Sequence, residues 1–211
     1  VIIMKILIIR HAAPDYANDS ITEKGHREAE ILSRRLAKLD IKEFYVSKLG
    51  RARDTLAYTL EKLNKEAIVC DWLKEFPIVI NKPNEAKSCA WNWRPLDWTA
   101  DDRYYSMNEW ATTSVMLEGK AQTEYDNVTT EFDKLLKKHG YERENRYYKA
   151  VSPNKDTIVL VCHFGVECVL LSHLLGIPPM LLWHGFCAAP SSVTTLVTEE
   201  VEKGIAYFRA S

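Results

Sequence analysis

Two apolar segments of this chain each end in a histidine. Residues 6–9 are followed by Arg10 and His11, and residues 157–161 are followed by Cys162 and His163. A guanidinium can bind an oxyanion, and an imidazole can act as a nucleophile or as a base. By itself, the Arg10–His11 pair is equally consistent with a strand that ends in two polar surface residues. The case for chemistry therefore depends on whether the fold brings the two histidines together.

Both apolar segments have the pattern of central parallel strands, since their branched and leucyl side chains run without polar alternation. Residues that follow such strands lie at the carboxyl edge of an α/β sheet, where ligands bind. A third strand, predicted over residues 44–47, is followed by Arg51 on the first turn of a helix. Free backbone amides and the helix dipole favour an anion there. We expect Arg51 to face inward and Arg53 to lie on the surface.

The remaining pattern predicts an α/β fold. Thr22 can cap a helix that runs to about Leu39, because its apolar residues recur at steps of three and four. Other predicted helices and strands cover residues 52–63, 67–70, 125–139, 166–174, 192–198 and 205–209. We therefore predict a single domain over residues 1–211, built as a three-layer sandwich. It has a central, mostly parallel sheet with helices on both faces and an antiparallel C-terminal hairpin.

Two segments interrupt this regular pattern. Residues 76–122 contain four of the six tryptophans and three prolines but no clear periodicity. An insertion of this length and apolar content is typical of a lid or binding loop, and its aromatic residues also serve to pack it. Residues 141–155 are charged and tyrosine-rich, and we expect a surface loop with at most a short hairpin. We expect His139 to be a solvated residue in the last turn of its helix.

Composition excludes several classes of function. The chain is 46% apolar and 27% charged with a formal net charge of −1, so it lacks the basic character of a nucleic-acid-binding protein. No segment is long enough to span a membrane. Five scattered cysteines without a CxxC pair favour reduced thiols and a cytoplasmic location. Cys162, His163 and Cys168 match no usual zinc spacing, and we expect neither a metal nor another cofactor.

Several motifs resemble those of the histidine phosphatase superfamily, whose fold is phosphoglycerate-mutase-like, and they occur in the family's order across most of the chain. They are Arg10-His11-Ala12, Ile21-Thr22-Glu23-Lys24-Gly25, the segment from Ser47 to Thr55 with Arg51, Leu73-Lys74-Glu75, and Val161-Cys162-His163-Phe164-Gly165. Ala12 replaces the usual glycine, a small change that a backbone with negative φ tolerates.

The resemblance implies a role for each matched residue. His11 is the nucleophile that accepts the phosphoryl group, and Glu75 protonates the leaving oxygen. Three side chains bind the phosphoryl oxygens, namely Arg10, Arg51 and His163. Alternative proton donors lie in the tryptophan-rich insertion, namely Glu85, Asp97 and Glu109. Further candidates for substrate contacts are Asp15, Asn18 and His184.

We therefore predict a metal-independent phosphomonoesterase of the histidine acid phosphatase type, acting through a phosphohistidine on His11. Its partner is a small phosphorylated substrate or inorganic phosphate. One alternative is a phosphoglycerate mutase, which moves phosphate between hydroxyl groups. Another is a non-catalytic module that binds a phosphorylated ligand. We prefer the phosphatase because the tryptophan-rich insertion resembles no mutase segment.

Overall fold

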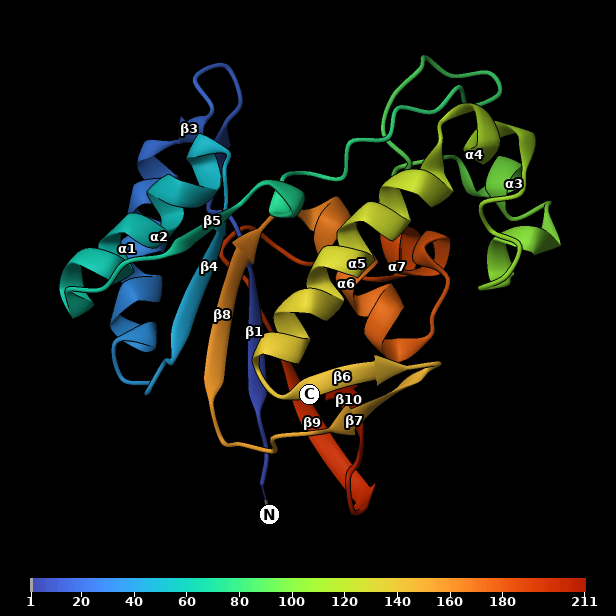
Figure 1. Cartoon of the computed structure of the whole chain (residues 1–211). Coiled ribbons are helices and arrows are strands. Elements are labelled where there is room, and N and C mark those ends of the chain that lie inside the picture. The colour runs from blue at the N-terminus through green and yellow to red at the C-terminus, as the bar shows by residue number, and fades with distance from the viewer. Residues whose placement is uncertain (1) are drawn as a thin grey trace.

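One mixed sheet of eight strands runs through the protein (Figure 1). The computed structural model describes residues 2–211, and the strands lie in the order β5-β4-β8-β1-β9-β10-β7-β6. Pairing is parallel from β5 to β1 and antiparallel from β1 to β6. The strands are β1 (Lys5–Arg10), β4 (Glu43–Ser47), β5 (Ile68–Cys70), β6 (Tyr141–Glu144), β7 (Tyr147–Ala150), β8 (Thr157–Cys162), β9 (Val193–Glu202) and β10 (Ile205–Ala210). The predicted α/β fold is confirmed, with parallel pairing confined to half of the sheet.

Helices cover both faces of this sheet, which explains the unbroken apolar sequence of β1. Leu7 and Ile9 pack in a core with residues of α1 (Glu23–Leu36) and α2 (Gly50–Leu63). Ile6 and Ile8 point to the other face, which is covered by α5 (Ala121–Lys138), α6 (Phe164–Leu175) and α7 (Pro179–Gly185). Successive side chains of a strand point to opposite faces, so a strand between two helical layers needs apolar residues at every position.

The helix ends follow their local sequence. Thr22 caps α1 as predicted, since its hydroxyl accepts a hydrogen bond from the Gly25 N–H at 3.1 Å. α1 ends at Leu36 rather than at Leu39, because Lys38 and Leu39 donate to carbonyls three residues back and close turns. Gly176 ends α6 in the left-handed conformation, with φ of 68°. Within residues 2–211, no helix is both long and apolar enough to cross a membrane.

The short hairpin that the sequence allowed within residues 141–155 is present, but it is part of the main sheet, so the expectation of a surface loop there is wrong. β6 and β7 form a hairpin, and β7 pairs with β10. Tyr141 and Tyr148 are buried and meet the ring of Phe208 edge to face. These tyrosines lie among charged residues, and this charge gave no sign in the sequence that the hairpin joins the main sheet through β10.

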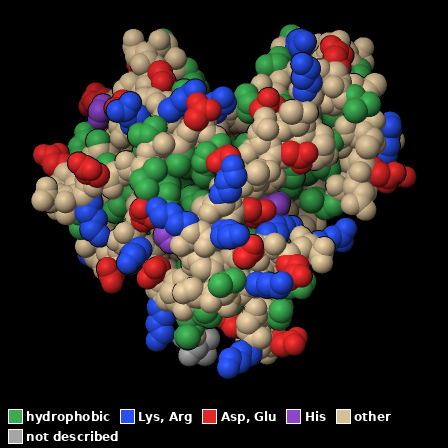
Figure 2. Space-filling view, in the orientation of Figure 1, with side chains coloured by type: hydrophobic (Ala, Val, Ile, Leu, Met, Phe, Trp, Pro, Cys, Tyr) green, Lys and Arg blue, Asp and Glu red, His purple; other side chains and the backbone are tan. Residues whose placement is uncertain are grey.

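The tryptophan-rich insertion is packed against the helical layer. It contains α3 (Pro95–Trp98), the 3₁₀ turn Asp102–Tyr105 and α4 (Ser114–Glu118). Three of its four tryptophans are buried in the same core as α5 and α6, namely Trp93, Trp98 and Trp110. The fourth, Trp91, is only partly buried. In Figures 1 and 2 the insertion forms one of two lobes that flank a notch, and the other lobe surrounds the two-stranded sheet of β2 (Pro14–Asp15) and β3 (Ser20–Ile21).

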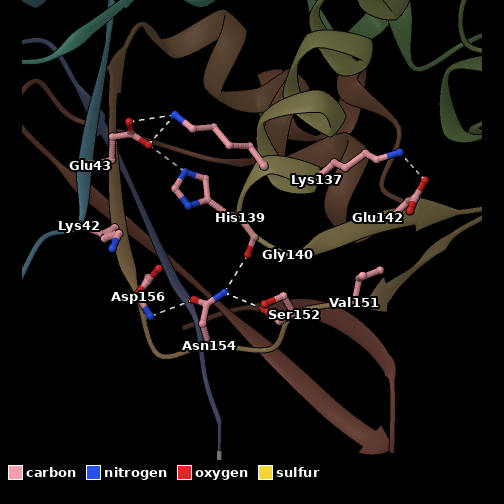
Figure 3. Close-up of a pocket in the computed structure, with 11 residues that line it drawn as sticks. Lys42, Glu43, Lys137, His139, Gly140, Glu142, Val151, Ser152, Asn154 and Asp156 are labelled. Atoms are coloured by element: carbon pink, nitrogen blue, oxygen red, sulfur yellow. Dashed lines mark hydrogen bonds and ion pairs between the residues drawn. The ribbon is translucent and has the colours of Figure 1, made fainter.

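A cavity of about 540 Å³ lies at the edge of the sheet where β4 and β8 begin, opposite the edge where these two strands end (Figure 3). We call it the amino-edge cavity. His139 lies beside it and is buried, with Nε2 at 2.7 Å from the Tyr45 hydroxyl and 3.2 Å from a Glu43 carboxylate oxygen. The prediction of a solvated His139 is therefore wrong, because the helix end docks against β4 rather than against water.

Candidate active site

His11 lies immediately after β1 and is almost fully buried. Its backbone N–H donates to the Cys162 carbonyl at 2.9 Å, which fastens it to the end of β8. Its ring Nδ1 is 2.8 Å from the Ala12 carbonyl, so Nδ1–H donates and Nε2 carries the lone pair. Burial first, and then the fields of Arg51 and Arg10, lower the pKa of His11 to about 4. The ring is therefore a neutral imidazole with a free nucleophilic nitrogen.

His163 lies at the end of β8, and its ring centroid is 5.1 Å from that of His11. Ser47 Oγ, at the end of β4, accepts the Leu49 N–H at 3.2 Å and lies 2.8 Å from His163 Nε2. The hydroxyl can then donate its own proton to Nε2, which leaves the imidazole proton on Nδ1. Burial is the main cause that lowers the pKa of His163 to about 2, and Arg51 adds to it. His163 is thus a neutral hydrogen-bond donor.

Two guanidinium groups complete the arrangement. Arg10 Nη1 donates to the Ala188 carbonyl at 2.7 Å, and Arg51 Nη1 binds Asp19 Oδ1 at 2.8 Å. The Nε atoms of both arginines and Nδ1 of His163 are buried and have no hydrogen-bond partner among residues 2–211. A buried donor without a partner costs about 1–3 kcal/mol. Arg51 is mostly buried and Arg53 is exposed, as their spacing predicts. Three unpaired donors and two positive charges around one neutral imidazole suit an oxyanion.

Glu75 is the acidic residue that the fold places beside His163. Its carboxylate accepts three backbone N–H groups, from Phe76 at 2.7 Å, Val166 at 3.0 Å and Gly165 at 3.2 Å. The last two belong to the first turn of α6, which begins directly after His163. Burial raises the pKa of Glu75, although these N–H groups oppose the rise. The carboxyl group can therefore hold a proton more readily than a solvated glutamate.

The three alternative acids are placed differently. Glu85 pairs with buried Lys82, and Asp97 pairs with Arg94 at 2.8 Å. Glu109 is exposed in the insertion. The structure thus joins Glu75, and none of these three, to the helix turn that follows His163. Within residues 2–211, no three His, Cys, Asp or Glu side chains are grouped so that they could hold a metal ion.

Comparison with known families agrees with this geometry. Residues 6–140, which include nearly all of β1, β4 and the whole insertion, match the model of the histidine phosphatase superfamily, branch 1. The chain belongs to the histidine phosphatase superfamily. The family assignment that the motifs suggested is therefore confirmed. The matched region contains four of the five residues around the oxyanion site, and His163 follows it in the same fold.

This member of the superfamily also resembles individual proteins. It is 37% identical over 76 residues to the 2,3-bisphosphoglycerate-dependent phosphoglycerate mutase of Thermoplasma acidophilum, a match that covers 31% of this chain and 38% of that relative. The match thus spans less than half of the mutase. Solved structures with the same fold include mycobacterial glucosyl-3-phosphoglycerate phosphatase, with a TM-score of 0.62 and 17% identity over 98% of this chain and 96% of that one. Another is phosphoserine phosphatase of Entamoeba histolytica in complex with 3-phosphoglyceric acid, with a TM-score of 0.59 and 18% identity over 92% and 90%.

The other predicted substrate contacts lie outside the cluster of buried donors. Asp15 is the last residue of β2 and Asn18 lies in the exposed turn that follows it, and their side chains hydrogen-bond to each other at 2.7 Å. Both ring nitrogens of His184 are engaged by backbone, with Nδ1 at 2.8 Å from the Met180 carbonyl and Nε2 accepting the Trp93 N–H at 3.2 Å. Burial lowers the pKa of His184. This neutral ring thus fastens the insertion to α7.

Sequence analysis missed Asp19, whose carboxylate holds Arg51 of the candidate site. Its two carboxylate oxygens bind Arg51 Nη1 at 2.8 Å and the Gly50 N–H at 2.7 Å. A Cβ at Gly50 would overlap the Asp19 carbonyl, so α2 can begin this close to Asp19 only because residue 50 is a glycine. No periodic signal marks Asp19, because it lies in a turn-rich stretch with other polar residues. Its positive φ of 45° is visible only in the fold.

Proposed function

We propose that this protein is a metal-independent phosphomonoesterase that transfers the phosphoryl group of its substrate to His11. One observation carries the proposal, namely that three buried N–H donors without partners among residues 2–211 surround a neutral imidazole. A phosphate dianion supplies the acceptors that these donors lack, and Arg10 and Arg51 offset its charge. A metal ion is not needed for charge neutralisation when two guanidinium groups provide it.

In the first step, Nε2 of His11 attacks phosphorus in line with the leaving oxygen. The N–P bond forms while the P–O bond to the substrate alcohol breaks. Glu75, protonated at this stage, gives its proton to the leaving oxygen, and its raised pKa supports this acid role. The donors on Arg10, Arg51 and His163 stabilise the charge on the three transferred oxygens, and each such donor contributes about 2.7–4 kcal/mol to barrier lowering.

In the second step, water hydrolyses the phosphohistidine. Glu75 is now ionised and accepts a proton from the attacking water, while the N–P bond breaks and returns the electron pair to Nε2 of His11. Inorganic phosphate leaves, and the site returns to its initial protonation state. The Nδ1–H bond to the Ala12 carbonyl holds the same tautomer of His11 throughout.

Replacement of the nucleophile tests this proposal. We expect the His11→Ala variant to lose turnover of a generic aryl phosphate while it keeps the circular dichroism spectrum and cooperative unfolding of the wild type. The matched control is His139→Ala, which removes a buried histidine at the other edge of the sheet. Unchanged turnover in His11→Ala would rule out the mechanism.

A phosphoglycerate mutase is the second candidate, and the 37% identity to the Thermoplasma enzyme over 76 residues favours it. A mutase returns the phosphoryl group of His11 to another hydroxyl group, so it must protect the phosphoenzyme from water. Incubation with 3-phosphoglycerate and 2,3-bisphosphoglycerate separates the two candidates. Release of inorganic phosphate supports the phosphatase, whereas isomerisation without phosphate release supports the mutase.

A further inference from the structure

A cavity of about 470 Å³ opens next to Arg10, and half of its lining residues are tyrosine, tryptophan or phenylalanine. We call it the aromatic pocket. Five of its ten lining residues are Tyr16, Trp91, Phe164, Trp183 and Phe186, and the others are Arg10, Asn92, His184, Cys187 and Ala188. Arg10 supplies the connection to the oxyanion site, since it lines the pocket and its Cζ lies 5.6 Å from the centre of the Phe164 ring.

The aromatic residues come from four parts of the chain, and those of the insertion, α6 and α7 pack against one another. Trp91 meets Phe164 edge to face at 6.2 Å and lies 6.2 Å from Trp183. Trp183 is buried and donates its indole N–H to the Gly165 carbonyl at 3.1 Å. On the other side Tyr16 is largely exposed and lies over Arg51, with the guanidinium carbon 5.3 Å from its ring centre. A pocket lined by packed rings and by one exposed ring suits a ligand with a planar group.

The pocket also lies where the leaving group of the substrate must be. A Cβ at Gly165 would overlap the Trp91 ring and would reach 2.7 Å from Glu75 Oε1, so the indole and the carboxyl group flank the same point of the backbone. Glu75 protonates the leaving oxygen in the proposed function. The part of the substrate attached to that oxygen therefore extends past Trp91. Trp91 is also the insertion tryptophan that is not fully buried, which leaves part of its ring free to contact a ligand.

The charges around the pocket disfavour a carboxylated leaving group. Arg10 is its single charged lining residue within the part of the chain that the structure describes, and one end of that guanidinium is held by the Ala188 carbonyl. Lys82, whose field helps to lower the pKa of His184, is buried and paired with Glu85 at 3.1 Å. A substrate carboxylate would therefore have to share Arg10 with the phosphoryl group and would gain no further cation here for the hydration it loses, which is costly.

We propose that the substrate is a phosphomonoester of an uncharged alcohol or phenol with an aromatic ring, and that Trp91 is its main specificity determinant. This inference rests on the proposed function, because it uses the position of the phosphoryl group at His11. It predicts that phosphoglycerate is a poor substrate. It also assigns a function to one tryptophan of the insertion and a packing function to the other three.

Three probes with alcohol leaving groups test the substrate class. They are benzyl phosphate, 4-carboxybenzyl phosphate and ethyl phosphate, which differ in the ring and in the carboxylate. We expect kcat/KM for benzyl phosphate to exceed the values for the other two by about 10-fold or more, in line with the burial and stacking energy of an aromatic ring. Equal or higher kcat/KM for 4-carboxybenzyl phosphate would overturn the proposal.

Two variants separate specificity from general damage. Trp91→Ala should lower kcat/KM for benzyl phosphate about 10-fold while it changes ethyl phosphate hydrolysis less than about 3-fold, and Trp72→Ala, in a different cavity, serves as the control. Cys187→Lys places a cation on the exposed rim and should raise the relative kcat/KM for 4-carboxybenzyl phosphate. An equal loss of kcat/KM on all three probes in Trp91→Ala would overturn the aromatic specificity but leave the proposed function standing. Failure to hydrolyse any phosphomonoester would overturn the proposed function and this inference with it.

Discussion

The two edges of the sheet each hold a buried histidine beside a cavity, but their electrostatic environments are opposite. At the carboxyl edge, His11 and His163 are surrounded by Arg10 and Arg51, and buried N–H donors lack partners among residues 2–211. At the amino edge, His139 contacts a carboxylate, Glu43, which also binds Lys138 at 2.9 Å.

The difference shows which features mark a functional site. The amino-edge cavity is the larger of the two, at about 540 Å³ against 470 Å³ for the aromatic pocket. Its histidine and two of its lysines nevertheless have carboxylate partners. Lys138 pairs with Glu43, and Figure 3 shows His139 with Glu43 and Lys137 with Glu142. The charges of the amino edge are satisfied by one another, whereas at the carboxyl edge buried donors without partners among the described residues lie beside two guanidinium groups, a combination that suits an anionic ligand. Volume alone would have selected the wrong edge.

The largest contrast between the edges should come from their glutamates. We expect Glu75→Gln to lower kcat for an alkyl phosphate by about 10²- to 10⁴-fold, because the poor leaving group needs a proton from this side chain. The loss should be smaller for 4-nitrophenyl phosphate, whose leaving group is stable as an anion. Glu43→Gln, the control at the amino edge, should leave kcat for both substrates within about 2-fold. Equal losses on the two substrates in Glu75→Gln would contradict the acid role.

The next effect concerns the donors around the oxyanion. Arg51→Met should reduce kcat about 10²- to 10³-fold, the usual cost of removing one such donor from a buried site. Arg53 lies two positions further along the same helix but faces solvent, so Arg53→Met should change kcat very little. Steady-state kinetics with one aryl phosphate suffice for both variants. Similar kcat values for the two would contradict the anion site.

The histidines of the carboxyl edge should also shape the pH dependence of stability. The pKa of His163 is about 2 in the folded protein and about 6.5 when unfolded, so the unfolded chain binds an extra proton below pH 6.5. The free energy of unfolding therefore falls as pH drops from 6.5 toward 4, by about 1.4 kcal/mol per pH unit for each such histidine. His163→Asn should lower this slope by about 1.4 kcal/mol per pH unit, which corresponds to one proton fewer taken up on unfolding. Urea unfolding between pH 4 and 6 measures the slope.

His139→Asn is the comparison at the amino edge. Burial also lowers the pKa of His139, but Glu43 opposes that shift, so this variant should change the slope less than His163→Asn does. A larger change in His139→Asn, or none in His163→Asn, would show that the electrostatic contrast between the two edges is wrong.

The smallest predicted effects separate two neighbouring aspartates. Asp19→Asn should lower kcat/KM about 10-fold, because it weakens the charged hydrogen bond that orients Arg51. Asp15→Asn should stay within about 2-fold, since its carboxylate binds Asn18 in an exposed turn. A larger loss in Asp15→Asn than in Asp19→Asn would restore Asp15 as a direct substrate contact.

Sequence patterns predicted most of the parallel half of the sheet. β1 and β8 are unbroken apolar segments because helices cover both their faces, and strand ends bring Arg10, His11 and His163 to one edge. Arg51 could be assigned an inward orientation because Ala52 beside it packs in the core. These residues were predictable since the periodicity of a regular element fixes where each side chain points.

The remaining features depend on contacts between distant segments. Tyr141 and Tyr148 are buried by the ring of Phe208 on β10, and no local pattern reveals that partner. His139 is buried because Tyr45 and Glu43 of β4 receive it. Asp19 binds Arg51 across 32 residues of chain. Trp91 is only partly buried against the core that encloses the other three insertion tryptophans, a difference that the sequence does not mark. Tertiary contacts of this kind leave no periodic pattern in the sequence from which they could be predicted.

Identification of the phosphorylated residue is the most direct test of the central claim. The protein is mixed with a ³²P-labelled aryl phosphate, quenched in alkali, where phosphohistidine is stable, and digested for peptide mapping. The account predicts a transient, acid-labile label on the peptide that contains His11, present in His139→Ala and absent in His11→Ala. A label on any other residue, or turnover by His11→Ala, would contradict the account. A label on His11 that persists without phosphate release would support transfer to the protein but not hydrolysis.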